Sequence, residues 1–136
     1  MQELLALLAG VPKFVTYLAL SLAVAMLFVA IYVRITPYRE LELIRNNNVA
    51  AALSLGGSFL GFCLPLAVTI SYSVNVLDFL LWALVAMVVQ IGVHFLMRAL
   101  IPGLTDAVKE GRTAVGTLSA FVAIGLGTLN AACLTP

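Results

Sequence analysis

Four long apolar segments, separated by short polar ones, set the pattern of this chain. The apolar segments cover residues 14–35, 49–72, 79–101 and 114–134. A helix rises about 1.5 Å per residue, so about 20 residues cross a hydrocarbon layer of about 30 Å. The pattern therefore predicts an all-α membrane protein with four transmembrane helices, in one integral membrane domain that covers residues 1–136.

The polar connections mark where these helices begin and end. Pro37 ends the first span, because proline disfavours helical geometry in the residue before it. Asn46, Asn47 and Asn48 precede the second span, where amide side chains can cap unpaired N–H groups. Asp78 opens the third span, with its negative charge at the positive end of the helix dipole.

Residues 1–11 are apolar but too short to span a bilayer. Gly10 and Pro12 interrupt them before Lys13, so we expect a separate interfacial helix. A cleaved signal peptide is the alternative, although its basic leader would have to precede the apolar run.

The composition is also typical of a protein embedded in a lipid membrane. It is 63% hydrophobic and 10% charged, with a mean hydropathy of +1.15, which is far from a soluble domain. The net charge is +1 and the seven Lys and Arg residues are scattered, whereas a nucleic-acid partner needs a clustered basic surface. Cys63 and Cys133 lie in apolar segments and are interpreted as small buried hydrophobic residues.

The basic residues also predict an orientation. Lys13 stands alone on one side of the membrane, and the other six lie on the opposite side: Arg34, Arg39, Arg45, Arg98, Lys109 and Arg112. Cytoplasmic loops carry the excess of Lys and Arg. We therefore expect both charged loops in the cytoplasm and both termini in the periplasm.

The two halves of the chain can be superposed with a shift of 65 residues. This shift places Pro37 on Pro102 and Asn48 on Thr113. Each half holds an even number of spans, so a repeat would consist of two parallel helical hairpins. Identities are few, and chance similarity between two hydrophobic hairpins is the alternative.

Small residues recur at helical spacing in the second and fourth spans. The second span carries Ala50, Ser54, Gly57, Ser58 and Gly61, and the fourth carries Gly116, Ala120, Ala123, Gly127 and Ala131. Such faces let another helix approach closely. We expect these two spans to pack together and to leave surface for a homo-oligomer; the alternative is packing inside one chain only.

Polar residues Gln90, His94 and Arg98 follow one face of the third span, at spacing i, i+4 and i+8. Polar groups inside a membrane often mark a path for ions or protons, and a histidine can relay protons. This face is therefore a candidate polar pathway. Alternatively, Arg98 reaches the interface and the other two bind neighbouring helices.

Pro65 interrupts the hydrogen bonding of the second span, because it has no N–H to donate to the carbonyl of Gly61. Asn130 lies at a comparable depth in the fourth span and carries an amide donor. We predict that Asn130 repairs or exploits this kink.

The sequence gives little support to a catalytic function. No carboxylate lies inside a span, and the chain has one histidine and two cysteines at different depths. Neither a metal set nor a nucleophile with its base can be assembled from these residues, so we expect no enzyme, no metal and no cofactor. The loop residues Arg39, Glu40, Glu42 and Arg45 are interpreted as a solvated helix face that could dock a cytoplasmic protein.

Several motifs resemble a known family. They are Tyr32, Ile35-Thr36-Pro37, the run from Leu43 to Ala51 around Asn46-Asn47-Asn48, Gly61, Pro65 and the closing Asn130-Ala131-Ala132-Cys133-x-Thr135. Along essentially its whole length the chain resembles the YjfL-type small inner-membrane proteins, the domain-of-unknown-function 350 family. The resemblance implies a four-span bacterial inner-membrane protein and a link to membrane maintenance, and it supplies no catalytic residues.

These observations together indicate a non-enzymatic inner-membrane protein. We expect a homo-oligomeric scaffold or partner, in contact with the lipid bilayer and with a cytoplasmic protein. The alternative is a small ion or proton channel, or a transporter subunit, that uses the polar face of the third span.

Overall fold

The computed structural model describes residues 1–136 and contains helices only. They are α1 (Gln2–Ala9), α2 (Val11–Ile35), α3 (Glu40–Arg45), α4 (Val49–Tyr72), α5 (Val76–Leu100), α6 (Leu104–Lys109) and α7 (Thr113–Cys133). Four helical stretches are long and apolar enough to cross a membrane: Gln2–Ile35, which joins α1 and α2, and then α4, α5 and α7. The predicted all-α architecture with four spanning helices is confirmed.

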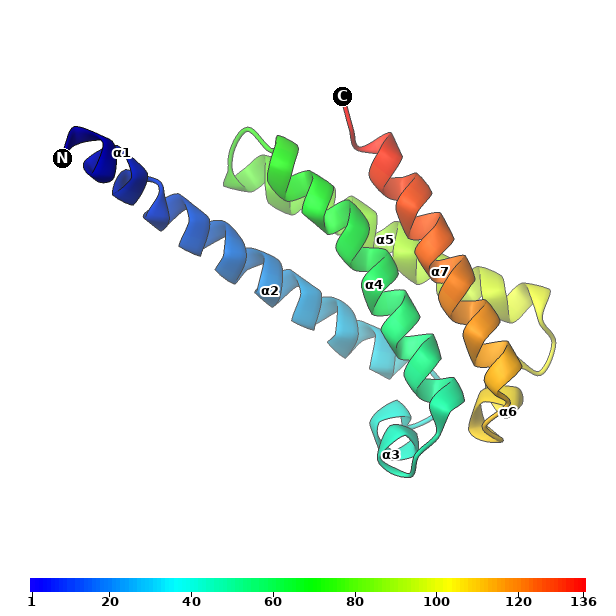
Figure 1. Cartoon of the computed structure of the whole chain (residues 1–136). Coiled ribbons are helices and arrows are strands. Elements are labelled where there is room, and N and C mark those ends of the chain that lie inside the picture. The colour runs from blue at the N-terminus through cyan, green and yellow to red at the C-terminus, as the bar shows by residue number, and fades with distance from the viewer.

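Helices α1 and α2 form one extended rod, and α1 at its N-terminal end lies away from the other helices (Figure 1). Gly10 joins them in a helical conformation, with φ −78° and ψ −19°. Pro12 lies in the first turn of α2, where its missing N–H breaks no helical hydrogen bond. The predicted interruption is present at Gly10, where α1 ends and α2 begins, but Pro12 does not break the helix, and α1 continues the line of α2 (Figure 1).

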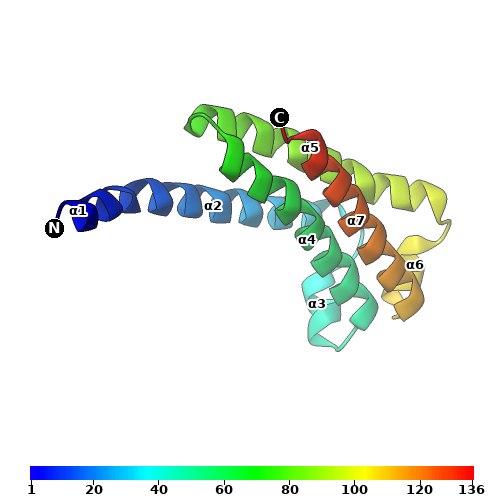
Figure 2. The ribbon, with the colours of Figure 1, turned by 45° about the horizontal axis from the view of Figure 1, so that its top comes forward.

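The other three long helices form the bundle. α4 and α7 run side by side and in the same direction in both views, with α5 packed against them (Figures 1 and 2). From Tyr17 onward, α2 packs on α4 and α5. The Phe28 ring of α2 stacks on the Phe62 ring of α4, with ring centroids 4.6 Å apart, and both side chains are completely buried. This aromatic contact anchors α2 to the bundle.

Side-chain caps decide where two long helices begin. Asn48 Oδ1 accepts a hydrogen bond of 3.0 Å from the Ala51 N–H at the start of α4. At α5 the cap is Asn75, whose Oδ1 accepts from the Asp78 N–H at 2.9 Å, and Asp78 Oδ2 accepts from Val74 N–H at 3.0 Å. Because Asn75 is the cap and Asp78 lies in the first turn, α5 begins at Val76 and not at residue 79.

Each half of the chain contains a long, a short and a long helix, and α3 and α6 lie at the same end of the molecule (Figure 1). The turn after each short helix has the same form. Asn47 and Gly111 have φ of 63° and 74°, and Asn48 N and Arg112 N each donate a 2.9 Å hydrogen bond back into the short helix.

These two turns do not fit the register of 65 residues, and the repeat itself stays a prediction. Asn47 corresponds to Gly111 and Asn48 to Arg112, so the shift at this turn is one residue smaller, and Asn48 does not match Thr113. The cause is the connection before the short helix, which covers residues 36–39 in the first half and only 101–103 in the second.

Candidate functional site

At Gln90 and His94 the polar face of α5 points into the bundle. Gln90 is only 1% exposed. Its Nε2 donates to the Ala123 carbonyl of α7 at 3.1 Å and to the Ser58 carbonyl of α4 at 3.4 Å. Gln90 therefore ties three helices together in the interior of the bundle.

His94 lies one turn closer to the end that carries α3 and α6, which we call the α3/α6 end. Its ring meets the edge of the Tyr32 ring, with centroids 5.1 Å apart, and the Tyr32 hydroxyl lies 3.3 Å from Ser54 Oγ. His94 is buried, and its Nε2 has no hydrogen-bond partner. Arg98, one turn further along, is exposed. The three predicted pathway residues thus differ: one is a helix tie, one an unpartnered buried ring and one a surface cation.

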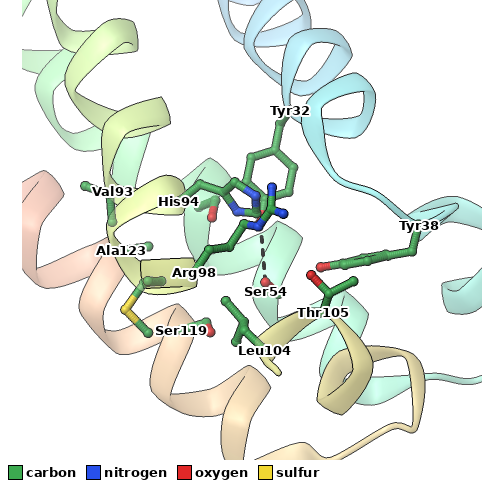
Figure 3. A pocket seen from close by; sticks show the side chains of 12 residues that line it. Tyr32, Tyr38, Ser54, Val93, His94, Arg98, Leu104, Thr105, Ser119 and Ala123 are labelled. Atoms are coloured by element: carbon green, nitrogen blue, oxygen red, sulfur yellow. Dashed lines mark hydrogen bonds between the residues drawn. The ribbon is translucent and has the colours of Figure 1, made fainter. Parts of the chain in front are cut away.

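His94 and Arg98 border a small polar chamber. Figure 3 shows both side chains reaching from α5 toward Tyr32, with Tyr38 and Thr105 on the opposite side. The chamber is lined by Tyr32, Tyr38, Ser54, Ser58, Val93, His94, Met97, Arg98, Leu104, Thr105, Ser119 and Ala123. Its volume of about 10 Å³ is close to the space that one water molecule needs. Ser119 Oγ is a second buried atom here without a partner.

Small residues close the chamber on the side away from the α3/α6 end. A Cβ atom added to Gly127 would overlap the carbonyl oxygen of Gly61, and one added to Gly61 would overlap the carbonyl of Ala123. On α4 and α7 no chamber residue lies beyond Ser58 and Ala123. One chain therefore holds a chamber in one half of the bundle, and tight helix packing separates it from the other half.

The two small-residue faces are in contact with one another. The buried members are Ala50, Ser54, Gly57, Ser58 and Gly61 on α4 and Gly116, Ala120, Ala123 and Gly127 on α7, and Ala131 is half-buried. A Cβ on Gly116 would lie 2.6 Å from Ala50 Cα. The expected packing of the second and fourth spans on one another is present, and this parallel helix pair occupies both faces within one chain. The homo-oligomer stays a prediction.

The proposed pair of Pro65 and Asn130 does not form. Asn130 Nδ2 donates to the Ala86 carbonyl of α5 at 3.5 Å. The Gly61 carbonyl, which Pro65 leaves without its helical donor, lies against the backbone of Gly127 instead. The axial register of α7 places glycine opposite this carbonyl and turns Asn130 toward α5.

The three loop asparagines have different roles. Asn46 is the C-terminal cap residue of α3, and Asn47 takes the left-handed conformation that asparagine tolerates better than most residues. Only Asn48 caps α4, and its Nδ2 also donates to the Val108 carbonyl of α6 at 2.8 Å. This bond joins the turn between α3 and α4 to α6.

Sequence reasoning missed Glu40. We expected it on a solvated face with its neighbours, and Arg39, Glu42 and Arg45 are indeed exposed. Glu40 is only 1% exposed, and neither carboxylate oxygen has a hydrogen-bond partner. Burial raises the pKa of Glu40 to about 8, against the opposing effect of the Thr36 hydroxyl. Burial also raises the pKa of Tyr38.

A signal for this burial was present in the sequence. Glu40 stands three and four residues before Leu43 and Ile44, so the three side chains share one face of a short helix. Leu43 and Ile44 pack against the buried cluster of Ala51, Met97, Leu104 and Val108. The face that docks these two residues also carries Glu40 into the interior.

A family model matches residues 6–134, which is nearly the whole chain, and its description is Domain of Unknown Function (DUF350). The chain belongs to the DUF350 family. It is 34% identical over 129 residues to the UPF0719 inner membrane protein YjfL of Escherichia coli (strain K12), which covers 95% of this chain and 98% of the relative. It is 25% identical over 118 residues to the UPF0719 transmembrane protein YshE of Bacillus subtilis (strain 168), covering 85% and 88%. No solved structure matches the chain.

The DUF350 assignment and the fold agree. The relatives are inner-membrane and transmembrane proteins by name, and this chain has four helices that can cross a bilayer. It is therefore a multi-pass inner-membrane protein of an uncharacterised family.

Proposed function

We propose that this DUF350 protein is a non-enzymatic scaffold of the bacterial inner membrane, a partner in membrane maintenance that presents its α3/α6 end to a cytoplasmic protein. The observation that supports this role is the closed interior. The Gln90 amide donates hydrogen bonds to backbone carbonyls of α4 and α7, and close contact between Gly61 and Gly127 fills the bundle beyond it. A polar face used in this way holds helices together.

The α3/α6 end supplies a suitable docking layer. The Asn48 bridge to Val108 fixes the turn between α3 and α4 to α6, and the exposed charges on the layer are mixed in sign, as in the ion pairs Arg39–Glu42 and Arg112–Glu110. In the proposed orientation this layer faces the cytoplasm, because most Lys and Arg residues lie at this end, and both termini are periplasmic.

The scaffold also stays a proposed homo-oligomer, but on different surfaces. The small-residue faces are occupied within one chain. α1 has no buried residue and lies away from the bundle (Figure 1), and Leu18 of α2 is exposed. This rod is the surface that a second copy would use, and cross-linking between copies through Leu18 would test it.

The test of the scaffold combines flux with proximity. The purified protein is reconstituted in vesicles of phosphatidylethanolamine and phosphatidylglycerol, and proton and potassium flux are measured. A photo-cross-linker is placed in cells at Leu41, exposed on α3, or at Phe121, exposed on α7. We expect silent vesicles, and one soluble protein cross-linked through Leu41 but not through Phe121. Flux by the wild-type protein above empty vesicles would overturn the scaffold role.

A second candidate, passage of protons by a small channel or transporter subunit, is favoured by the chamber. Unpartnered His94 Nε2 and Ser119 Oγ border a space of about one water molecule, as a proton relay requires. Passage would also need the contact of α4 with α7 to open. If vesicles carry a proton flux, its loss in His94→Gln, with retention in the control Thr117→Val, which is half-buried and does not line the chamber, would support this candidate.

A further inference from the structure

Glu40 is the first residue of α3, and its carboxyl group is buried without a partner. It is 1% exposed, and both oxygens lack a hydrogen bond. An ionised carboxylate in such a place is costly, because it has lost its water without gaining a cation or donors. The same group in its neutral, protonated form bears a much smaller penalty. The packing therefore selects the acid form.

No neighbouring cation stabilises the ionised form. The titratable groups with a charge interaction with Glu40 are the phenols of Tyr32 and Tyr38. The Thr36 hydroxyl is close enough to lower the pKa of Glu40, but its hydrogen bonds go to the backbone carbonyls of Tyr32 and Val33, which leaves the carboxyl group without a partner.

α4, on which α3 packs, contains no Lys, Arg, Asp or Glu. The other titratable side chains of the spans near this end are Arg34 in the last turn of α2, which is exposed, and His94 and Arg98 of α5. Arg98 acts on Tyr38, and none of the three acts on the pKa of Glu40.

The charged residues on the short helices point elsewhere. They are Arg39, Glu42 and Arg45 around and within α3, and Asp106 and Lys109 on α6, all of them exposed. The pairs they form are surface pairs such as Arg39–Glu42. None of them neutralises the buried carboxyl group.

A metal ion does not fit at Glu40. The chain contains no group of three or more His, Cys, Asp or Glu side chains that could hold one. Glu40 does not border the chamber of His94 or the surface groove between α3 and α6. A proton is the one ligand that a carboxylate can take without any surrounding volume.

We propose that Glu40 is a proton-binding site that holds α3 on the bundle while it is protonated and releases α3 when it ionises. On release, the O–H bond of the carboxyl group breaks and the proton passes to water at the α3/α6 end. The carboxylate then gains hydration by leaving the interior, and Leu43 and Ile44 leave their cluster with it. The raised pKa of about 8 places this transition slightly above neutral pH.

Release would reshape the proposed docking layer. α3 forms one wall of the groove lined by Tyr38, Arg39, Glu42, Leu43, Asn46 and Lys109, and this groove exists only while α3 is docked. The proposal for Glu40 does not depend on the scaffold role. Release of α3 would also change the opening of the chamber, because Tyr38 lines it.

Distance measurements in lipid nanodiscs test the release. Nitroxide labels are attached at Leu41 on α3 and at Thr113 at the start of α7, in a background with Cys63→Ala and Cys133→Ala. Electron paramagnetic resonance then gives the distance distribution from pH 6 to pH 10. We expect a narrow distribution at pH 6 and a longer, broader one at pH 10, with a midpoint within about one pH unit of 8.

Two variants of the same short helix give the contrast. Glu40→Gln keeps the size and neutrality of the protonated acid, so its distribution should stay narrow at every pH. Glu42→Gln, at an exposed position, should keep the wild-type transition. A wild-type distribution that does not change, or a transition that persists in Glu40→Gln, would overturn the proposal.

Infrared spectroscopy of the wild-type protein covers the case in which Glu40→Gln does not fold. A buried protonated carboxylic acid has a C=O stretching band that an ionised carboxylate lacks. This band should be present at pH 6 and lost on the same midpoint as the distance change. Its absence at pH 6 would contradict a protonated Glu40 and refute the inference, while leaving the scaffold role to its own flux and cross-linking results.

Discussion

Replacing Gly127 by Ala should destabilise the bundle far more than the same change at Gly125, two residues earlier in α7. A Cβ on Gly127 would overlap the Gly61 carbonyl, and the nearest atoms of Gly61 are all backbone. Backbone cannot rotate aside as a side chain can, so α4 and α7 must move apart. At Gly125 no atom lies within 4 Å of the added methyl group.

The expected difference follows from this geometry. Overpacking a tight contact costs about 1–3 kcal/mol, and here the upper part of that range applies because the obstacle is backbone. Helix propensity favours Ala over Gly by up to about 1 kcal/mol in water, but spans that stay helical in the membrane when they separate gain little of it. We expect Gly127→Ala to lower the unfolding free energy by about 2 kcal/mol, and the unfolding free energy of Gly125→Ala to stay within about 0.5 kcal/mol of wild type.

The assay is reversible unfolding by sodium dodecyl sulfate in mixed micelles, followed through the fluorescence of Trp82, the only tryptophan. Both variants contain one added methyl group on the same helix, so the comparison isolates the contact with α4. Equal unfolding free energies for the two variants would refute the close approach of α4 and α7 at Gly61.

Three further predictions concern the polar contacts. Asn48→Ala should lower the unfolding free energy by about 1–2 kcal/mol, because it removes a helix cap and the hydrogen bond to Val108. Asn48→Asp should retain the cap but still lose the hydrogen bond to Val108, and both variants are measured in the same unfolding assay. Gln90→Leu should cost at most about 1.7 kcal/mol, the upper range for hydrogen bonds between helices in membranes, and a larger loss would mean that the amide does more than join α4 and α7. For Glu40 the folded pKa of about 8 lies above the ordinary 4.5, so the folded state binds more protons than the unfolded state between these pH values. The unfolding free energy therefore falls as pH rises from about 4.5 to about 8, by up to about 5 kcal/mol. Glu40→Gln should remove this pH dependence, and a slope equal to that of wild type would contradict the buried acid.

Local signals in the sequence predicted the frame of the molecule. The length of the apolar segments is enough to predict four spanning helices, because a bilayer imposes one length on every helix that crosses it. Asn48 was predictable as a cap because capping involves only the residue and the N–H groups of the next turn. The start of α5 was misplaced because two polar residues, Asn75 and Asp78, compete for that role three positions apart.

The sequence by itself thus determined which segments cross the membrane, that two of them carry close-packing faces, and to which family the chain belongs. Only the tertiary structure decided which surfaces meet: α4 on α7 within one chain, Asn130 on Ala86 rather than at Gly61, and Glu40 inside rather than in water. The physical reason is that hydrophobic length and capping act within a few residues, whereas the rotation of a short helix and the axial register between two long ones depend on contacts far apart in the chain.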